Sequence, residues 1–311
     1  KTRVINTEKK LEVAEARAQT AQAQTAQARQ TLAVASKENT SLKAEVTNER
    51  TDKVIAQKAA EELRENIAKR IPDQPINGNM MATLYFQNQV ELQLQAVRGF
   101  GRKDETSPTV LIEVMEKGKP YVHAITHASD TPYRLARNAL AFRESSGSLM
   151  PRDSKPLTLS APPQHVRFLK DDPRVIIIPL GPADSKQVNA LGVKPYKLAA
   201  KPYKFPKAFI MSKNGKYGTV EFKIDRKYKG YVKVDRIFFN FAGKFNPAKG
   251  DLVFSQTNEL LGIMANNKYC LVLQSAAPAN AIMFGKNDSS KVAQVLGSMQ
   301  KLIGAKPFAL Q

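Results

Sequence analysis

Three short apolar runs follow one another in residues 251–273, which read DLVFSQTNELLGIMANNKYCLVL. Each run is rich in Leu, Ile, Val or Phe, and polar turn residues separate one run from the next. Such runs are typical of short β-strands joined by tight turns. Similar runs occur earlier in the chain, at 109–114, 175–178, 218–224 and 230–234. The pattern therefore predicts a mainly β domain of the barrel or sandwich type.

The last apolar segment of the chain has a different period. Within residues 289–303, Val292, Leu296, Met299 and Ile303 recur at intervals of three or four. This spacing places them on one face of a helix. We therefore expect an amphipathic C-terminal helix that closes the barrel.

The first 71 residues contain neither glycine nor proline, and Pro72, Pro75 and Gly78 follow at once. Counted in sevens from Leu11, with companion positions three residues later, 13 of 17 core positions are apolar and seven of those are alanine. This pattern predicts a long helix with a thin coiled-coil seam. We expect a stalk over 1–71, a linker over 72–84 and a β-domain over 85–311. Self-association through 1–71 is favoured, and a single solvated helix packed on its own domain is the alternative.

The charge and the cysteine and histidine counts limit the kinds of partner and site that this chain could have. The 311 residues include 48 basic and 28 acidic side chains, a formal charge of +20, which favours polyanions, anionic lipid or an acidic partner. One cysteine excludes an internal disulfide, and with only three histidines no metal-site spacing is present. We therefore predict neither a metal nor a cofactor. No apolar run reaches the 18 residues expected of a membrane-spanning helix.

A basic stretch begins with a repeat, Lys194-Pro195-Tyr196-Lys197 and then Lys201-Pro202-Tyr203-Lys204. Lysines beside aromatic rings suit contacts with phosphates and bases. No signature of a known nucleic-acid-binding fold accompanies the repeat. An acidic protein, an anionic polymer and nucleic acid therefore stay open as partners. The candidate binding residues are Lys194, Tyr196, Lys197, Lys201, Tyr203 and Lys204.

Three segments, in order, resemble the trypsin-like (chymotrypsin-fold) serine proteases, and most closely their bacterial high-temperature-requirement branch. The first, YVHAITHASD at 121–130, resembles the strand that ends in the family's general base, and His127 falls on that position. The second, DDPRVIIIPL at 171–180, resembles the strand that follows the orienting aspartate. Arg174 stands where the family has that acid.

The third segment, NPAKGDLVF at 246–254, resembles the loop that carries the nucleophilic serine. Lys249 stands at the serine position. The resemblance covers about residues 85–305 and implies a chymotrypsin-like double β-barrel. It also implies that His127, Arg174 and Lys249 lie in one cleft.

The replaced residues argue against hydrolysis. Acyl transfer by this machinery needs a hydroxyl nucleophile, a neutral imidazole and a carboxylate that orients it. Lys249 is a poor nucleophile while protonated, and Arg174 cannot accept the imidazole N–H. We therefore expect an inactive homologue of a serine endopeptidase, in which His127, Arg174 and Lys249 bind a partner. An acidic peptide is the ligand that the two cations favour.

The favoured hypothesis is a non-catalytic scaffolding protein in which the stalk oligomerises a protease-fold binding domain. One alternative is an active endopeptidase with shifted residues, using Asp172 as the orienting acid or Ser255 as the nucleophile. A second alternative is a basic protein that binds polyanions or nucleic acid. By analogy with the resembled family, a periplasmic, cell-envelope or extracellular location is favoured.

Overall fold

The computed structural model describes residues 74–99, 101–116, 118–135, 142–151, 165–181, 192–213, 215–234 and 246–311, with scattered positions between 25 and 58 and at 186, 188 and 190. Contacts divide the chain into two units, Lys1–Ile71 and Pro72–Gln311. The predicted long helix and coiled coil over 1–71 lie mostly outside the described residues. Residues 35–41, which are described, are helical.

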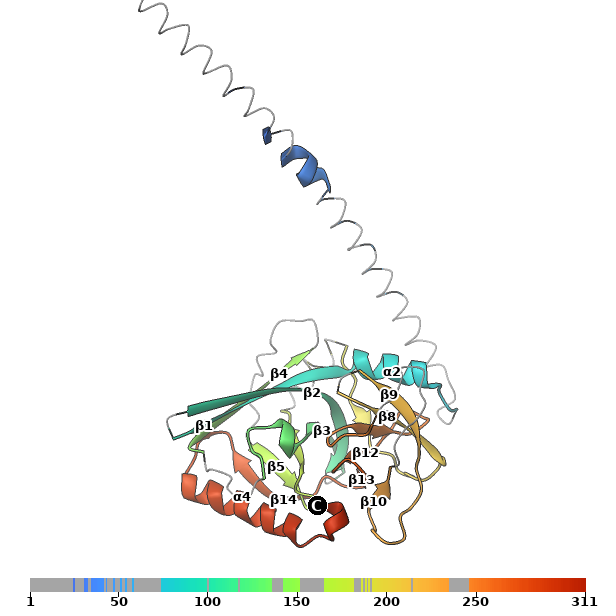
Figure 1. Ribbon diagram of the computed structural model, residues 1–311, viewed down its shortest axis with the longest axis vertical. Helices are drawn as coiled ribbons and strands as arrows, with labels where there is room; N and C mark the ends of the chain where they lie inside the picture. The colour runs from blue at the N-terminus through green and yellow to red at the C-terminus, as the bar shows by residue number, and fades with distance from the viewer. Residues whose placement is uncertain are drawn as a thin grey trace, which may run out of the picture. The chain divides into compact units, whose positions relative to one another are not determined.

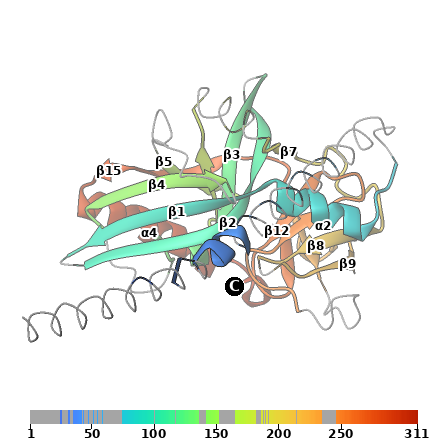
Figure 2. The ribbon, with the colours of Figure 1, turned by 90° about the horizontal axis from the view of Figure 1, so that it is seen from above.

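In the described part of the second unit, the strands form two antiparallel sheets, with one short parallel pair in the larger sheet (Figures 1 and 2). The expectation of a mainly β unit with a C-terminal helix is confirmed. The strands of the larger sheet are β1 (Gln89–Arg98), β2 (Gly101–Glu116), β3 (Lys119–His127), β4 (Glu144–Pro151), β5 (His165–Leu169), β6 (Val175–Pro179), β7 (Tyr196–Lys197), β14 (Pro278–Met283) and β15 (Gly285–Lys286). The strands of the smaller sheet are β8 (Lys207–Met211), β9 (Tyr217–Glu221), β10 (Tyr231–Lys233), β11 (Leu252–Phe254), β12 (Leu260–Met264) and β13 (Tyr269–Val272).

Each sheet has its own apolar core. The strands of the larger sheet pair in the order β14-β5-β6-β3-β2-β1-β4-β15. They enclose a cluster that includes Leu92, Phe168 and Ile176. The strands of the smaller sheet pair in the order β10-β13-β12-β11-β8-β9 and enclose a cluster that includes Val253 and Met264. The runs quoted above become β11, β12 and β13, whose residues are all buried. Their lack of polar alternation fits strands in the middle of a sheet.

The C-terminal helix α4 (Ser289–Gly304) covers part of the larger sheet (Figure 1). Asp288 caps it by accepting a hydrogen bond from the Ser290 backbone N–H at 2.9 Å. Its buried residues, Val292, Leu296 and Met299, lie on one face and join the core of that sheet. A short 3-10 turn, η2 (Phe308–Leu310), follows it.

The segment predicted as a linker, 72–84, contains the first turns of helix α2 (Gly78–Gln87). Asn77 caps this helix by accepting a hydrogen bond from Met80, and Met81, Leu84 and Tyr85 are buried. The packed unit therefore begins before residue 85. Pro75 and Gly78 suggested a linker because both residues disrupt helices, but Pro75 precedes the cap and Gly78 is the first residue of α2. None of the helices among the described residues is long and apolar enough to cross a membrane.

Gly262, in the middle of β12, allows a test of how closely β12 packs against β13. A Cβ atom built there would lie 2.1 Å from the Leu271 carbonyl oxygen and 2.7 Å from the Cys270 Sγ. Because the first of these is backbone of the neighbouring strand, Gly262→Ala should lower the free energy of unfolding by about 2 kcal/mol or more. Urea denaturation measures the change.

Gly297→Ala is the matched control, because a Cβ atom on that residue of α4 would have no neighbour within 4 Å. We expect it to be neutral or to stabilise the protein by up to about 1 kcal/mol. Equal free energies of unfolding for the two variants would contradict the described packing of β12 against β13.

Candidate functional site

His127, Arg174 and Lys249 line one cavity of about 990 Å³. His127 ends β3, Arg174 immediately precedes β6, and Lys249 lies in the loop before β11. Pairing of β3 with β6 sets His127 opposite Val175, and the Ala128 N–H donates to the Arg174 carbonyl at 2.7 Å. Both sheets and the C-terminal segment contribute to the walls. The three positions therefore come together as the sequence resemblance predicts.

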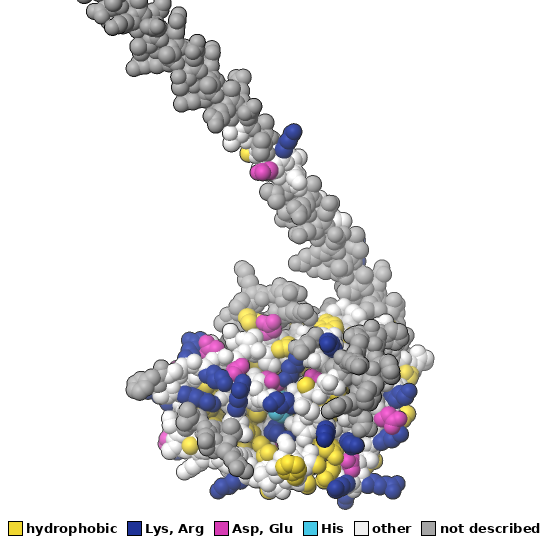
Figure 3. Space-filling view, viewed as in Figure 1, with side chains coloured by type: hydrophobic (Ala, Val, Ile, Leu, Met, Phe, Trp, Pro, Cys, Tyr) yellow, Lys and Arg dark blue, Asp and Glu magenta, His cyan; other side chains and the backbone are white. Residues whose placement is uncertain are grey.

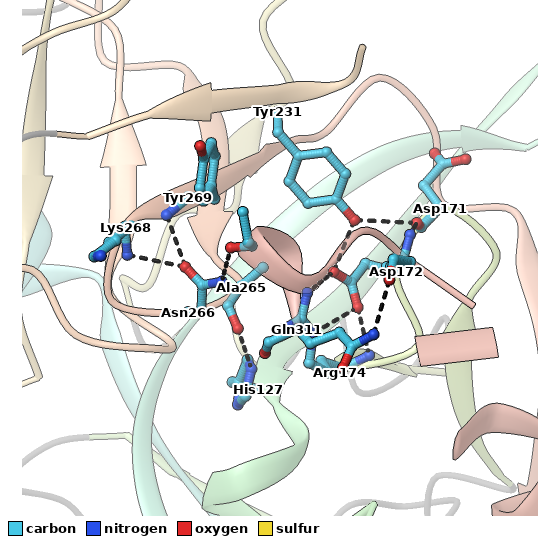
Figure 4. Close-up of polar contacts among 12 residues, drawn as sticks. His127, Asp171, Asp172, Arg174, Tyr231, Ala265, Asn266, Lys268, Tyr269 and Gln311 are labelled. Carbon is cyan, nitrogen blue, oxygen red and sulfur yellow. Dashed lines mark hydrogen bonds and ion pairs between the residues drawn. The ribbon is translucent and has the colours of Figure 1, made fainter. Parts of the chain in front are cut away.

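Both ring nitrogens of His127 have partners within the protein. Nδ1 accepts a hydrogen bond from the Ser129 backbone N–H at 3.1 Å and lies 2.8 Å from the Ser129 hydroxyl. Nε2 lies 3.2 Å from the Ala265 carbonyl oxygen (Figure 4). The imidazole thereby caps a 3-10 turn, η1 (Ala128–Asp130), and ties it to the smaller sheet.

These contacts assign the tautomer of His127. A backbone N–H can only donate, so Nδ1 is the acceptor and the ring proton is on Nε2, which donates to Ala265. Burial lowers the pKa of this imidazole to about 4, so the ring is neutral near pH 7. A trypsin-like general base needs the reverse arrangement, with Nδ1–H donating to a carboxylate and Nε2 free to accept a proton.

The carboxylate closest in sequence to the orienting position is Asp172, and it is bonded elsewhere. Its two oxygens accept hydrogen bonds from Arg174, through Nε at 3.0 Å and Nη2 at 2.6 Å, and from the Tyr231 hydroxyl at 2.8 Å (Figure 4). Asp172 is fully buried, and these bonds hold its pKa below the usual value despite the cost of burial. In the described geometry, Asp172 therefore serves Arg174 and not His127.

Arg174 also holds the C-terminal segment. Its Nη1 donates to the Gln311 carbonyl oxygen at 2.8 Å. Asn266 donates to the Ala309 carbonyl at 3.1 Å, and Leu310 is buried. Residues 308–311 therefore form part of the cavity wall beside His127, while the Phe308 ring is 91% exposed.

The loop at the nucleophile position offers no free oxyanion donors. In trypsin-like enzymes the N–H groups of the nucleophile and of the residue two positions earlier bind the oxyanion. Here the earlier residue is Pro247, which has no N–H. The Lys249 N–H donates to Asn267 at 3.3 Å, and the Gly250 N–H donates to the Met264 carbonyl at 2.7 Å.

A second ion pair fixes this loop. Lys213 pairs with Asp130, and its Nζ also donates to the Lys249 carbonyl at 3.3 Å. Both side chains pack against Gly250, whose φ of +85° favours glycine. The Lys249 and Lys268 ammonium groups form no ion pair with a described residue, and both line the cavity. Two ammonium groups without an ion pair to a described residue therefore line the cavity.

The predicted binding residues of the basic repeat do not form one site. Tyr196 is buried, 4.8 Å from the Phe254 ring centroid, and burial raises the pKa of its hydroxyl. The prediction that Tyr196 is a binding residue is therefore wrong, because its ring faces the core. Tyr203 is half-buried and stacks on Phe222. The lysines of the repeat are exposed, namely Lys194, Lys197, Lys201 and Lys204.

Several residues of the site were missed by the sequence analysis. Ser129, Asn267 and Gln311 contact the three predicted positions, yet each is a common polar residue in an ordinary turn or terminus. The one feature of the sequence that could have indicated a contact with His127 is that Ser129 follows it by two residues. Ser255, the predicted alternative nucleophile, accepts hydrogen bonds from the Thr257 and Glu259 N–H groups and caps the β11–β12 turn. Among the described residues, no group of three or more His, Cys, Asp or Glu could hold a metal ion.

No protein-family model matches the chain, and no curated protein sequence is significantly similar to it. Solved structures that resemble it include Deg5, at 10% identity and a TM-score of 0.36, covering 63% of this chain and 91% of that one. Another is a catalytically inactive tobacco etch virus protease in complex with substrate, at 8% identity and a TM-score of 0.32, covering 69% and 93%. Both likenesses are distant, and neither assigns a function to this chain.

The buried imidazole of His127 predicts a pH dependence of stability. Its folded pKa of about 4 is below the value of 6.5 for a free imidazole. Between these values the unfolded chain binds more protons, so the stability contributed by neutral His127 is complete above about pH 6.5 and is lost as the pH falls toward 4. His127→Asn keeps an acceptor for the Ser129 N–H and should flatten the pH dependence.

Urea denaturation of both proteins at pH 7.5, 6.0 and 4.5 measures this effect. The difference between the proteins isolates His127 from His123, whose pKa burial also lowers to about 4, and from Asp251, whose pKa burial raises to about 6. An equal loss of stability on acidification in both proteins would refute the role given to His127.

Proposed function

We propose that residues 72–311 form a trypsin-like double barrel that has lost hydrolytic activity and acts as a binding module. Two features support a protease ancestry. Each sheet has a separate core, and the cavity lined by His127 receives residues from both sheets. The positions of base, acid and nucleophile in the resembled family correspond to His127, Arg174 and Lys249, which all line that cavity.

The observation that carries the loss of activity is the bonding of His127. Nδ1 accepts from the Ser129 backbone, and the proton on Nε2 is directed to the Ala265 carbonyl. The ring therefore has no lone pair directed at the Lys249 loop. Removing a proton from a nucleophile there would require breaking both contacts and turning the ring. The Asp172 carboxylate, bonded to Arg174 and Tyr231, is not available to stabilise the turned ring.

The ligand that fits the cavity best is an acidic peptide segment. Lys249 and Lys268 line the cavity without an ion pair to a described residue, and Asp130, its one acidic lining residue, is neutralised by Lys213. Arg174 contributes little to anion binding, because its charge is balanced by Asp172. Two uncompensated ammonium groups in a partly enclosed space favour carboxylates over neutral chains.

One observation favours the alternative of an active endopeptidase. The Ser129 hydroxyl is 2.8 Å from His127 Nδ1, and Nε2 is oriented by Ala265, which is the arrangement of an activated nucleophile. Three features oppose it. The imidazole pKa of about 4 makes a weak base, Nδ1 is shared with the Ser129 N–H, and the hydroxyl also lies 3.3 Å from Asp130 Oδ1.

We expect the protein to bind an acidic peptide without cutting it. A peptide rich in Glu, with a fluorophore at one end and a quencher at the other, reports binding by anisotropy and cleavage by dequenching. The wild-type protein should bind it and leave it intact, and Lys249→Glu with Lys268→Glu should weaken binding at least tenfold. A fluorophosphonate probe should label neither the wild-type protein nor Lys249→Ser, in which Arg174 still replaces the orienting acid.

Ser129→Ala is the control that separates the two functions. Cleavage or labelling that is present in the wild-type protein and absent in Ser129→Ala would establish the active endopeptidase instead. Absence of peptide binding, with no cleavage, would refute the proposed ligand while leaving the loss of hydrolysis in place.

We further propose that residues 1–71 self-associate as a stalk. The heptad pattern supports this, and Leu32, at one of its core positions, is 73% exposed in the single chain. An apolar side chain left that exposed gains free energy by packing against another copy. Alanine occupies seven of the 13 apolar core positions, so each heptad contributes little and association depends on length.

Sedimentation equilibrium of the full chain should show an oligomer at micromolar concentration. Leu11→Asp with Leu32→Asp puts charges into the seam and should yield the monomer, whereas Glu8→Asp, outside the counted core positions, should change nothing. A wild-type protein that remains monomeric at high micromolar concentration would rule out the stalk.

A further inference from the structure

A lysine-rich surface on the smaller sheet lies apart from the residues that line the cavity. Residues 194–233 contain 12 basic and two acidic side chains, a net charge of +10 within 40 residues. All 12 except Lys213 are exposed. We define the lysine surface as Lys201, Lys204, Lys207, Lys223, Lys227 and Lys229. In Figure 1 the segment between β9 and β10 runs along the right-hand edge, and in Figure 3 dark blue side chains recur along that edge.

Backbone pairing gathers four of these lysines, Lys201, Lys204, Lys207 and Lys223. Lys207 on β8 lies opposite Glu221 on β9, and the Phe222 N–H donates to the Pro206 carbonyl at 2.9 Å. The segment that carries Lys201 and Lys204 therefore lies beside the end of β9. Stacking of Tyr203 on Phe222, with centroids 5.7 Å apart, fixes this arrangement.

The two acidic residues of the stretch do not cancel its charge. Glu221 pairs with Lys223, but both side chains are more than 60% exposed, so the pair is weak. Asp225 Oδ1 accepts the backbone N–H groups of Lys227 and Tyr228 and thereby shapes the turn that presents Lys227 and Lys229. The surface thus keeps a dense positive charge.

Aromatic rings lie between the lysines and are only half-buried. The Lys204 ammonium lies 5.3 Å from the centre of the Phe205 ring, and that of Lys227 lies 5.2 Å from the centre of Tyr228. A base that stacks on such a ring brings its phosphate to the neighbouring ammonium. An acidic protein uses the charge alone, so the repeated pairing of ring and ammonium favours a nucleic acid.

From this arrangement we propose that the lysine surface binds single-stranded nucleic acid, independently of the cleft. Eleven of the 12 basic residues in the stretch are lysines, which contact phosphates as point charges and read no base edges. The described part of the stretch has strands and turns, with no helix to enter a duplex groove. Partly exposed rings in the bends before β8 and before β10 suit unpaired bases. Binding is therefore tolerant of sequence and strongly dependent on salt.

Fluorescence anisotropy of the full chain with a labelled 20-nucleotide single-stranded DNA, at several salt concentrations, tests this proposal. Affinity should fall steeply with salt, because each phosphate contact contributes about −0.7 to the slope of log K against log salt. The triple variant Lys204→Gln, Lys207→Gln, Lys223→Gln should reduce that slope by about 2. Phe205→Leu should weaken binding about tenfold and leave the slope unchanged, because it removes stacking alone.

The matched control is Lys286→Gln, Lys291→Gln, Lys301→Gln, which removes the same charge from exposed positions on β15 and α4. It should bind nearly as the wild-type protein does. Equal losses in the two triple variants would show a response to net charge only and would overturn the assignment. Polyglutamate of matched charge binding as tightly as DNA, with Phe205→Leu unaffected, would overturn it in favour of an acidic protein partner. No binding at low salt would refute it outright.

Discussion

The hydrogen bond from the Ser129 backbone N–H to His127 Nδ1 is the constraint on which the functional interpretation depends. Because that donor belongs to the main chain of η1, the ring cannot turn without leaving this N–H of the 3-10 turn without its capping acceptor. The proton is thus kept on Nε2, where it holds the carbonyl of Ala265 in the other sheet. His127, at the position that resembles the family's general base, is a structural bridge between the two sheets.

The cationic residue at the orienting-acid position is likewise bonded within the fold. Arg174 stands where the resembled family has its orienting acid, and the carboxylate of Asp172 serves it in place of the imidazole. Breaking such a buried pair by removing one partner typically costs about 3–5 kcal/mol, since a charge is left without compensation. Tyr231 and the Gln311 carbonyl complete the bonding of the pair. The residues at the positions that resemble the family's base and acid therefore contribute to the stability of the fold. If the proposed loss of hydrolysis holds, a single substitution would not rebuild the catalytic arrangement, because both side chains are already bonded elsewhere.

Sequence patterns predicted the elements whose signal is local. The runs that became β11, β12 and β13 are short, apolar and bounded by turn residues, and α4 has clear helical spacing. Helix α2 was misread because its capping Asn77 and buried Tyr85 acquire their meaning only from packing. Tyr196 and Tyr203 occupy equivalent places in the repeat, yet Tyr196 is buried and Tyr203 is only half-buried at the margin of the core. A repeat in sequence does not reveal which copy meets a neighbouring strand.

The two positive regions differ in a way that local sequence does not show. In the cavity, ion pairs with Asp130 and Asp172 compensate Lys213 and Arg174, and the charge that remains is that of a few lysines in a partly enclosed space. On the lysine surface, charge is dense, exposed and interleaved with rings. At physiological ionic strength, exposed charges separated by more than about 8 Å are largely screened from each other. The partly enclosed cavity therefore suits a short acidic segment, whereas the dense and exposed charge of the lysine surface suits an extended polyanion.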